Sequence, residues 1–346
     1  MVLFTLCQED LYKRAIKAYF KISKYFVNVK TCIKTFLKLF DHTVKPIFLY
    51  ACEIWGTINI NSCVVKKDDY ILEHSFRNLY CDKLHMKSLK YILGVHKHSV
   101  NDAVLGETGR YPLYIDMLTQ STKYFSRLLN AKPTALISSA FQESLALHKA
   151  SKTTWVSSML FLFDKCKLSQ GQHYDKNLSG MVKTKVVNEF KMNWSARLNK
   201  CENEQSGKLR TYAKFKKQFM YEPYLDYIKD SDVRVFLTKL RISSHKLEIE
   251  AGRYKNIPAT DRLCKCCTLR QTETEKHFMF DCPLYECERS VYVTKIGKIV
   301  QLFPTLTKKE QFIYSMSSEN IETIVLTGNF VYQCHLARFK FIEAKR

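Results

Sequence analysis

Glycine and proline are scarce in this chain, and their scarcity constrains the fold more than any other feature of the sequence. Only 10 glycines and 7 prolines occur in 346 residues. A many-stranded β architecture depends on tight turns, and these two residues supply the backbone conformations that tight turns need. The sequence therefore predicts a mainly α-helical protein with long helices and few turns.

Apolar residues recur at spacings of three and four, the period of one face of an α-helix. Leu11, Ala15 and Ile22 follow this period in the first segment. Pro46 is expected to interrupt the second helical run, and Gly56 and Gly94 to end helices. The predicted helices span residues 8–27, 31–42, 46–56, 70–93, 112–130, 181–205, 208–220, 230–240, 305–317 and 319–343, with a short helix before Gly109, two helices within 134–166 and an amphipathic segment over 241–254.

Cations exceed anions by a wide margin. The chain has 55 Lys and Arg residues against 33 Asp and Glu residues, a formal net charge of +22. Such an excess favours a polyanionic partner, because each neutralised phosphate releases counterions. A generally basic surface without a specific partner has the same composition, so charge alone does not decide between the two.

The 13 cysteines raise the question of secretion. The N-terminal segment has no basic region, and Gln8, Glu9 and Asp10 interrupt its apolar run, so it does not resemble a signal peptide. The sequence contains no uninterrupted apolar stretch of about 18 residues, so it predicts no membrane span. We therefore expect reduced thiols in an intracellular protein of the cytoplasm or nucleus, with some of them available to bind a metal.

One cysteine–histidine cluster has metal-ligand spacing. Cys264, Cys267, His277 and Cys282 form the pattern C-x2-C-x9-H-x4-C. Zinc binds four such donors at tetrahedral corners, and a site closed in this way is structural and offers no Lewis-acid chemistry. The sequence therefore predicts a structural zinc ion.

Two alternatives stay open for this cluster. The first is a cysteine-rich segment without metal, held by the aromatic packing of Phe278, Phe280 and Tyr285. The second is a different ligand set, because Cys266 and Cys287 are spare thiols. Cys266 in particular could replace Cys264 or Cys267.

Several segments together resemble the reverse transcriptases of non-LTR retrotransposons. The segment Leu39–Gly56 is similar to the region just beyond the polymerase palm of that family. The other matching segments resemble the thumb and the C-terminal region: Glu73–Leu84, Tyr91–Val95, Gly106–Leu113, Leu240–Tyr254, the Cys264–Cys267 run and His277–Tyr285. Their order and joint occurrence carry the resemblance, which covers roughly residues 30–130 and 205–345.

The resemblance, together with a polar segment near 168–180 that contains two glycines, predicts a three-part organisation of the chain. Residues 1–133 would form a thumb-like helical region, and residues 134–205 a helical connector with a linker near 168–180. Residues 206–346 would form a helical C-terminal region with the cysteine motif, 261–289, as a small zinc-knuckle-like insert. In the family, the thumb holds a template–primer duplex and the cysteine module engages nucleic acid, so RNA or DNA is the expected partner, with no membrane involved.

The sequence departs from the family in its catalytic residues. These polymerases need a Tyr/Phe-x-Asp-Asp turn between apolar strands to hold two magnesium ions. The only Asp-Asp pair here is Asp68-Asp69, which follows Lys66 and Lys67 and lacks flanking apolar strands. We therefore expect a solvated loop at this place, no magnesium site and no catalytic residue. Common phosphate-loop, hydrolase and metalloprotease motifs do not occur either.

A cluster of cations beside aromatic residues suits contacts with a nucleic-acid backbone and base stacking. A solvated helix face over an apolar core would have the same pattern. The predicted nucleic-acid-binding residues are Lys239, Arg241, His245, Lys246, Arg253 and Tyr254.

Two functions fit the sequence. The first is a truncated, non-catalytic reverse-transcriptase fragment that retains affinity for RNA or DNA. The alternative is a helical structural or protein-interaction domain without nucleic-acid binding. A salt titration of RNA and DNA binding separates them.

Overall fold

The fold is mainly helical, which confirms the predicted fold class. The computed structural model describes residues 2–28, 32–57, 60, 72–76, 79–168, 177–204 and 207–345. Within these ranges there is no β-strand, and only two isolated bridges join extended residues, Thr108 with Tyr221 and Leu263 with Thr272. The predicted loop at Asp68-Asp69 and most of the predicted linker at 168–180 lie outside the described residues. Among the described helices, none combines the length and the apolarity that a membrane span needs.

Contacts along the chain divide it into two compact units. The first comprises Met1–Val29, Thr35–Ser88 and Tyr111–Asn193, and the second comprises Lys30–Lys34, Leu89–Arg110 and Trp194–Arg346. The three regions expected from the resemblance stay a prediction.

The first unit is a set of helices. α2 (Ile33–Leu39), α7 (Tyr80–Ile92) and α12 (Leu178–Asn203) run through boundaries between the units. The remaining elements of the first unit are α1 (Val2–Asn28), η1 (Phe40–Val44), α3 (Lys45–Phe48), α4 (Cys52–Trp55), α6 (Leu72–Ser75), α9 (Tyr114–Leu129), α10 (Leu136–Lys149) and α11 (Trp155–Lys165).

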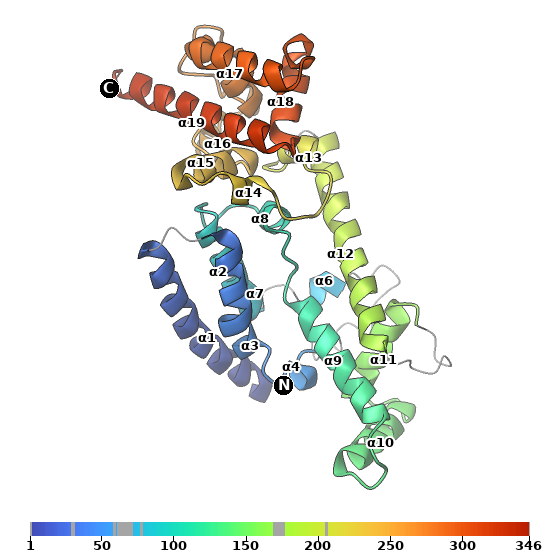
Figure 1. Cartoon of the computed structure of the whole chain (residues 1–346). Helices are drawn as coiled ribbons and strands as arrows, with labels where there is room; N and C mark the ends of the chain where they lie inside the picture. The colour runs from blue at the N-terminus through green and yellow to red at the C-terminus, as the bar shows by residue number, and fades with distance from the viewer. Residues whose placement is uncertain are drawn as a thin grey trace. The chain divides into compact units, whose positions relative to one another are not determined.

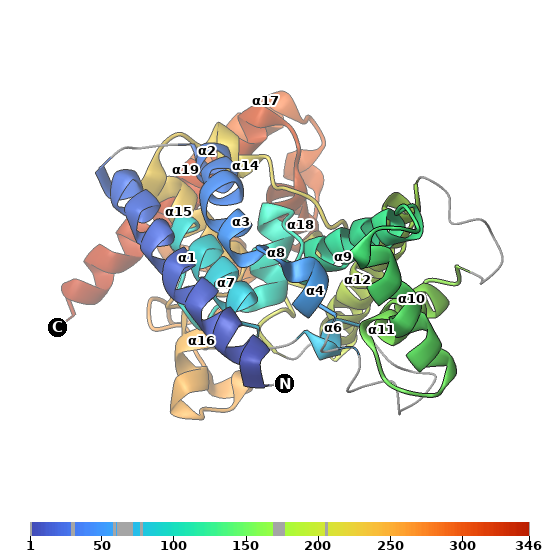
Figure 2. The same ribbon diagram turned by 90° about the horizontal axis from the view of Figure 1, so that it is seen from below.

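α1 buries the face that its apolar spacing predicts. Leu11, Ala15 and Ile22 are buried, and α1 packs against η1 and α3. Figures 1 and 2 show α1 beside α3. The chain stays helical ahead of Pro46 by widening into the π-helical turn η1, and α3 ends at Phe48. The predicted single helix over 46–56 is wrong, because Ala51 adopts a left-handed conformation (φ 54°) that separates α3 from α4.

α9 packs against α4, α10 and α11. Phe125 on α9 contacts Phe141 of α10 and Phe163 of α11 edge to face, at ring-centroid distances of 5.4 and 5.0 Å. Figure 2 shows these three helices gathered together. The indole of Trp155 also donates a 2.9 Å hydrogen bond to the carbonyl of Glu53, which ties α11 to α4. Aromatic packing therefore joins segments that are far apart in the sequence.

The second unit is built around α19, its longest helix. α19 packs against α15 and α17, as Figure 1 shows. The helices of this unit are α8 (Asn101–Thr108), α13 (Tyr212–Phe215), α14 (Tyr224–Tyr227), α15 (Ser231–Arg241), α16 (Glu248–Ala251), α17 (Glu286–Ile299), α18 (Lys308–Ser317) and α19 (Ile321–Glu343), with short 3-10 or π turns at Gly252–Lys255, Ala259–Asp261, His277–Asp281, Pro283–Tyr285 and Phe303–Thr305.

Two sequence predictions in the second unit are wrong. The helix predicted over 208–220 shrinks to the four residues of α13, and the amphipathic segment 241–254 is broken into α16 and a 3-10 turn. Helix α17 was not predicted at all. The apolar residues of α17 follow the helical period only weakly, so the sequence gives little sign of this helix. In the structure, α17 packs against α19.

Candidate functional site

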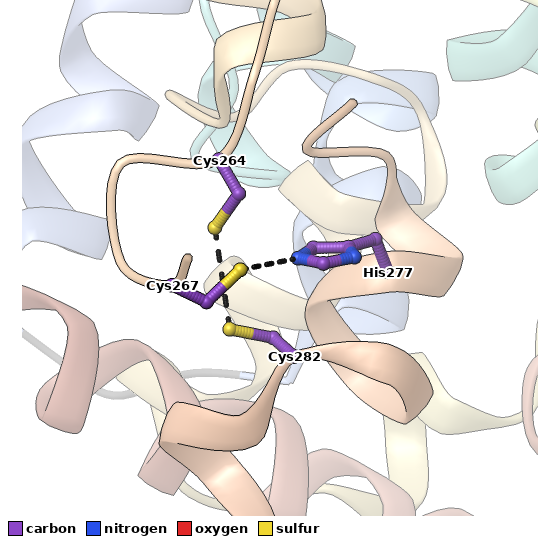
Figure 3. Close-up of side chains that lie close together, drawn as sticks. All are labelled: Cys264, Cys267, His277 and Cys282. Atoms are coloured by element: carbon purple, nitrogen blue, oxygen red, sulfur yellow. Dashed lines mark hydrogen bonds between the residues drawn. The ribbon is translucent and has the colours of Figure 1, made fainter. Parts of the chain in front are cut away.

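The four side chains predicted to bind zinc come together in the second unit. Figure 3 shows Cys264 and Cys267 approaching from one loop and His277 and Cys282 from the turn His277–Asp281 and its end. Their ligand atoms all lie within 4.8 Å of one another. We refer to these four residues as the metal centre. This arrangement could hold a metal ion.

The distances within the metal centre fit a tetrahedral ion. The Sγ atoms of Cys264 and Cys282 are 4.0 Å apart, and Cys267 Sγ is 3.5 Å from His277 Nε2. Zinc bonds of about 2.3 Å to sulfur and about 2.0 Å to nitrogen place two sulfurs about 3.8 Å apart and a sulfur and a nitrogen about 3.5 Å apart. The donors therefore need only small movements to close around an ion.

Backbone hydrogen bonds hold both halves of the centre. The amide of Cys264 donates to the carbonyl of Gln271 (2.9 Å), which closes the loop that carries Cys264 and Cys267. The amide of Cys282 donates to the carbonyl of His277 (2.8 Å), which fixes the π-helical turn between these two ligands. The local fold thus positions the donors in two pairs.

The imidazole of His277 is oriented by a second contact. Its Nδ1 lies 3.1 Å from Oε1 of Gln271, while Nε2 faces Cys267. If Nδ1 carries the proton and donates it to Gln271, Nε2 presents a lone pair to a metal, as the outer contacts of metal-binding histidines commonly arrange. Gln271 was missed by sequence reasoning, since a glutamine inside the x9 spacer gives no signal of its own.

The structure also decides the place of the spare cysteines. Cys266 lies with Cys264 and Glu273 and is outside the group of four converging donors. Its amide donates to the Cys264 sulfur at 3.4 Å. Hydrogen bonds from Cys266 and Cys282 lower the pKa of the Cys264 thiol, which favours the thiolate form that binds metals. Cys287 is exposed, and no disulfide joins any of the described cysteines.

An ion pair connects the metal centre to α19. Arg338 on α19 binds the carboxylate of Glu273 with two hydrogen bonds of 2.8 and 2.9 Å, and Glu273 is nearly completely buried. The Cys264 sulfur is 3.9 Å from the same carboxylate. The loop of the metal centre is therefore tied to the longest helix of the unit through a bidentate charged contact.

Arg241, predicted to contact nucleic acid, is buried. Its guanidinium donates to Glu107 at 2.8 and 3.0 Å and pairs with Glu222 at 2.8 Å. It also lies over the rings of Phe215 and Tyr224. We therefore leave Arg241 out of the candidate binding surface, because a cation with 4% exposure and two carboxylate partners cannot reach a phosphate.

His245 is buried in a second charged cluster. Its Nε2 lies 3.0 Å from Glu275, which also pairs with Arg210 and accepts hydrogen bonds from Thr211 and Ser243. Burial would raise the pKa of Glu275, but the hydrogen bond and charge of His245, together with Arg210, lower it well below its usual range. His245 therefore also stays out of the surface. Glu107 and Glu275 were missed by sequence reasoning, because isolated glutamates usually lie in water.

The other predicted binding residues reach the surface. Lys246 is exposed and Lys239 half-buried, whereas Arg253 is paired with Glu250 at 3.1 Å. Tyr254 is 67% exposed, and Lys208 donates a 2.9 Å hydrogen bond to its hydroxyl. Lys208 is a further surface cation that the sequence did not single out.

Cations crowd one another in this part of the second unit. Burial and the charge of Lys208 lower the pKa of Lys90. Burial lowers the pKa of His98, and the charge of Lys97 lowers it further. Among the described residues, no carboxylate lies within ion-pairing distance of these lysines or of Lys239 and Lys246. We call the following five residues the basic surface: Lys90, Lys97, Lys208, Lys239 and Lys246.

A groove of about 740 Å³ adjoins this surface. It runs between α15 and α19, with the turn at Gly94–His96 and the segment 244–247 as its other walls. Lys239 and Lys246 line it, so the basic surface extends into a hollow. We call it the α15–α19 groove.

Comparisons of the chain with protein-family models, with curated proteins and with solved structures found no match.

Proposed function

We propose that the second unit binds RNA or DNA through the basic surface, and that the metal centre holds a structural zinc ion. The observation that carries the proposal is that Lys239 and Lys246 line one groove in a chain of net charge +22, with no carboxylate within ion-pairing distance of either among the described residues. Lys90, Lys97 and Lys208 lie close to one another on the same basic surface. Unpaired, mutually repelling cations raise the local potential, and a polyanion relieves this repulsion while it releases counterions.

Zinc is the metal that the donors favour. Three thiolates and one imidazole are soft or borderline ligands, and all four positions of a tetrahedron are filled by the protein. Such an ion would contribute folding free energy to the segment and no Lewis-acid chemistry. Its effect on nucleic-acid binding would be indirect, through the Glu273–Arg338 contact to α19.

The resemblance to non-LTR reverse transcriptases supports the same assignment, since members of that family act on RNA and DNA. On the resemblance alone, we also propose descent from such an enzyme. We assign nucleic-acid binding to the basic surface and no catalytic step to that surface.

A salt titration tests the proposal. Binding of a fluorescein-labelled single strand of about 20 nucleotides is followed by anisotropy at several salt concentrations. The triple variant Lys208→Gln/Lys239→Gln/Lys246→Gln should bind more weakly. Its slope of log K against log salt should be less negative by about 2, because each lost phosphate contact removes about 0.7 from the slope on a single strand.

A matched control removes the same charge elsewhere in the same unit. The variant Lys295→Gln/Lys298→Gln/Lys309→Gln changes three exposed lysines of α17 and α18. It should leave the slope close to that of the unchanged chain. A slope near zero for the unchanged chain, or equal losses in both triple variants, would overturn the basic surface and favour the helical interaction domain instead.

A further inference from the structure

One wall of the α15–α19 groove is an aromatic and apolar face of α19. His335, Phe339 and Ile342 are separated by four and three residues, so they lie on one side of this helix. Phe339 is 54% exposed, so its phenyl ring is open to solvent on this wall. Phe236 of α15, which also lines the groove, stacks directly on one face of the His335 ring, with centroids 4.0 Å apart and planes within 19°.

The charges around this aromatic face are mainly positive. Lys239 and Lys246 line the groove, and Glu343 adds one carboxylate to the lining. Arg338 also reaches the groove, but its guanidinium is bound by Glu273. The groove therefore joins flat apolar rings to two lysines without carboxylate partners, a combination that fits a ligand with a planar ring and an anionic backbone.

The imidazole in the groove is held in its neutral form. Burial lowers the pKa of His335, and the charges of Arg338, Lys239 and Lys246 lower it further. At neutral pH this ring is therefore an uncharged planar surface beside cations, which is suited to stacking and does not add to their repulsion.

We propose that the α15–α19 groove takes an unstacked base of a single-stranded nucleic acid, which packs against Phe339 and His335 while Lys239 and Lys246 hold the flanking phosphates. The inference depends on the proposed function and adds the class of nucleic acid to it. Bases in a duplex are paired and stacked, so they cannot enter a hollow without unpairing, whereas every base of a single strand presents a free ring face. The volume of the groove is within the range of pockets that enclose small ligands.

Three probes with the same label separate base contacts from phosphate contacts. They are an oligothymidylate of about 12 nucleotides, a strand of equal length with abasic sugars, and a duplex of equal length. The unchanged full chain should bind oligothymidylate about 10-fold more tightly than the abasic strand, because stacking of one base on an aromatic residue has an effect of this size.

Substitution of the exposed ring should remove this preference. Phe339→Ala should weaken oligothymidylate binding about 10-fold and leave abasic binding unchanged, and Phe339→Trp should retain the preference. The ring is largely exposed, so its removal should not disturb folding. Tyr227→Ala, which removes a 41% exposed aromatic ring from α14 in the same unit, is the matched control and should change neither affinity.

The outcomes distinguish this inference from the proposed function. The base-binding groove would be overturned if oligothymidylate and the abasic strand bind equally, or if Phe339→Ala weakens binding of both probes equally. The basic surface would still be supported in that case if the lysine variant weakens binding. No salt-dependent binding of any probe would overturn both. Self-association of the chain that Phe339→Ala abolishes would also overturn the groove assignment, because a second copy would then cover this face.

Discussion

Single residues show how a buried environment changes the role that a sequence suggests. Arg241 occurs among surface cations in the sequence, but in the structure it is enclosed by Glu107, Glu222 and two aromatic rings. Burial would raise the pKa of Glu107, and the charge and hydrogen bonds of Arg241 lower it below its usual range. The two charges are therefore mutually dependent, since either alone would be costly inside the unit.

The first prediction concerns this ion pair. Arg241→Met should lower the free energy of unfolding by about 3–5 kcal/mol, because it leaves the carboxylate of Glu107 buried without its cation. The double variant Glu107→Gln/Arg241→Met should recover part of the loss, since no uncompensated charge remains. Urea denaturation of the single and double variants measures both effects. A loss below about 1 kcal/mol for Arg241→Met would contradict the buried pair.

The second prediction concerns Asp82, a half-buried carboxyl group of the first unit that accepts a 2.9 Å hydrogen bond from the Leu113 amide. Burial raises the pKa of Asp82 from 3.8 to about 7. Between these values the folded chain binds a proton that the unfolded chain releases. The contribution of Asp82 to stability is therefore greatest at acidic pH and is lost as pH rises toward 7.

Asp82→Asn should remove this pH dependence, because asparagine keeps the acceptor oxygen for Leu113 and cannot ionise. The stability of the variant minus that of the unchanged chain should be about 1–2 kcal/mol larger at pH 8 than at pH 5. This value is reduced for the partial solvent access of the group. Denaturant unfolding at both pH values measures this. Asp164→Asn, at an exposed aspartate of α11, should show no such difference, and a similar response in both variants would contradict the assignment to Asp82.

At the scale of elements, the segment that carries the metal centre has little regular structure. Between α16 and α17 the chain contains short 3-10 and π turns and one isolated bridge. Phe278 and Phe280 are completely buried and supply part of its packing. A bound metal would therefore add a large share of the local stability, as it does in other segments with few hydrogen-bonded elements.

The third prediction follows from this local fold. The purified chain should contain about one zinc per molecule, and removal of zinc by a chelator should increase amide hydrogen exchange in residues 264–282 and around Arg338, because Glu273 transmits the loss to α19. Elemental analysis and hydrogen-exchange mass spectrometry measure the two effects.

Two variants provide the controls for zinc binding. His277→Ala should lose the metal and show the same exchange pattern without a chelator. Cys287→Ser changes an exposed thiol outside the metal centre and should keep the metal. Less than about half an equivalent of zinc in the unchanged chain would favour the aromatic packing alternative.

At the scale of the whole molecule, segments that are far apart in the sequence form each unit. The second unit combines Lys30–Lys34, Leu89–Arg110 and Trp194–Arg346. Within it, Gly106 packs so closely on Tyr212 and Trp194 that a side chain would collide with them, and Glu107 binds Arg241 across 134 positions of sequence. Gly109 has a positive φ of 60°, and a side chain at this position would collide with the backbone of Tyr221. The short motif Gly106–Gly109 therefore gains its importance from contacts with residues remote in sequence.

The sequence by itself determined the helical class, most of the long helices and the four Cys and His side chains that come together in the second unit. Helical periodicity and ligand spacing are local properties, so a linear pattern is enough to read them. The tertiary structure alone decided that Arg241 and His245 are buried, that Cys266 lies outside the group of four converging donors and that Lys239 and Lys246 line one groove with residues of α19. Burial and charge pairing depend on which distant residues fold against a side chain, and neither the charge of a residue nor its neighbours in the sequence contain that information.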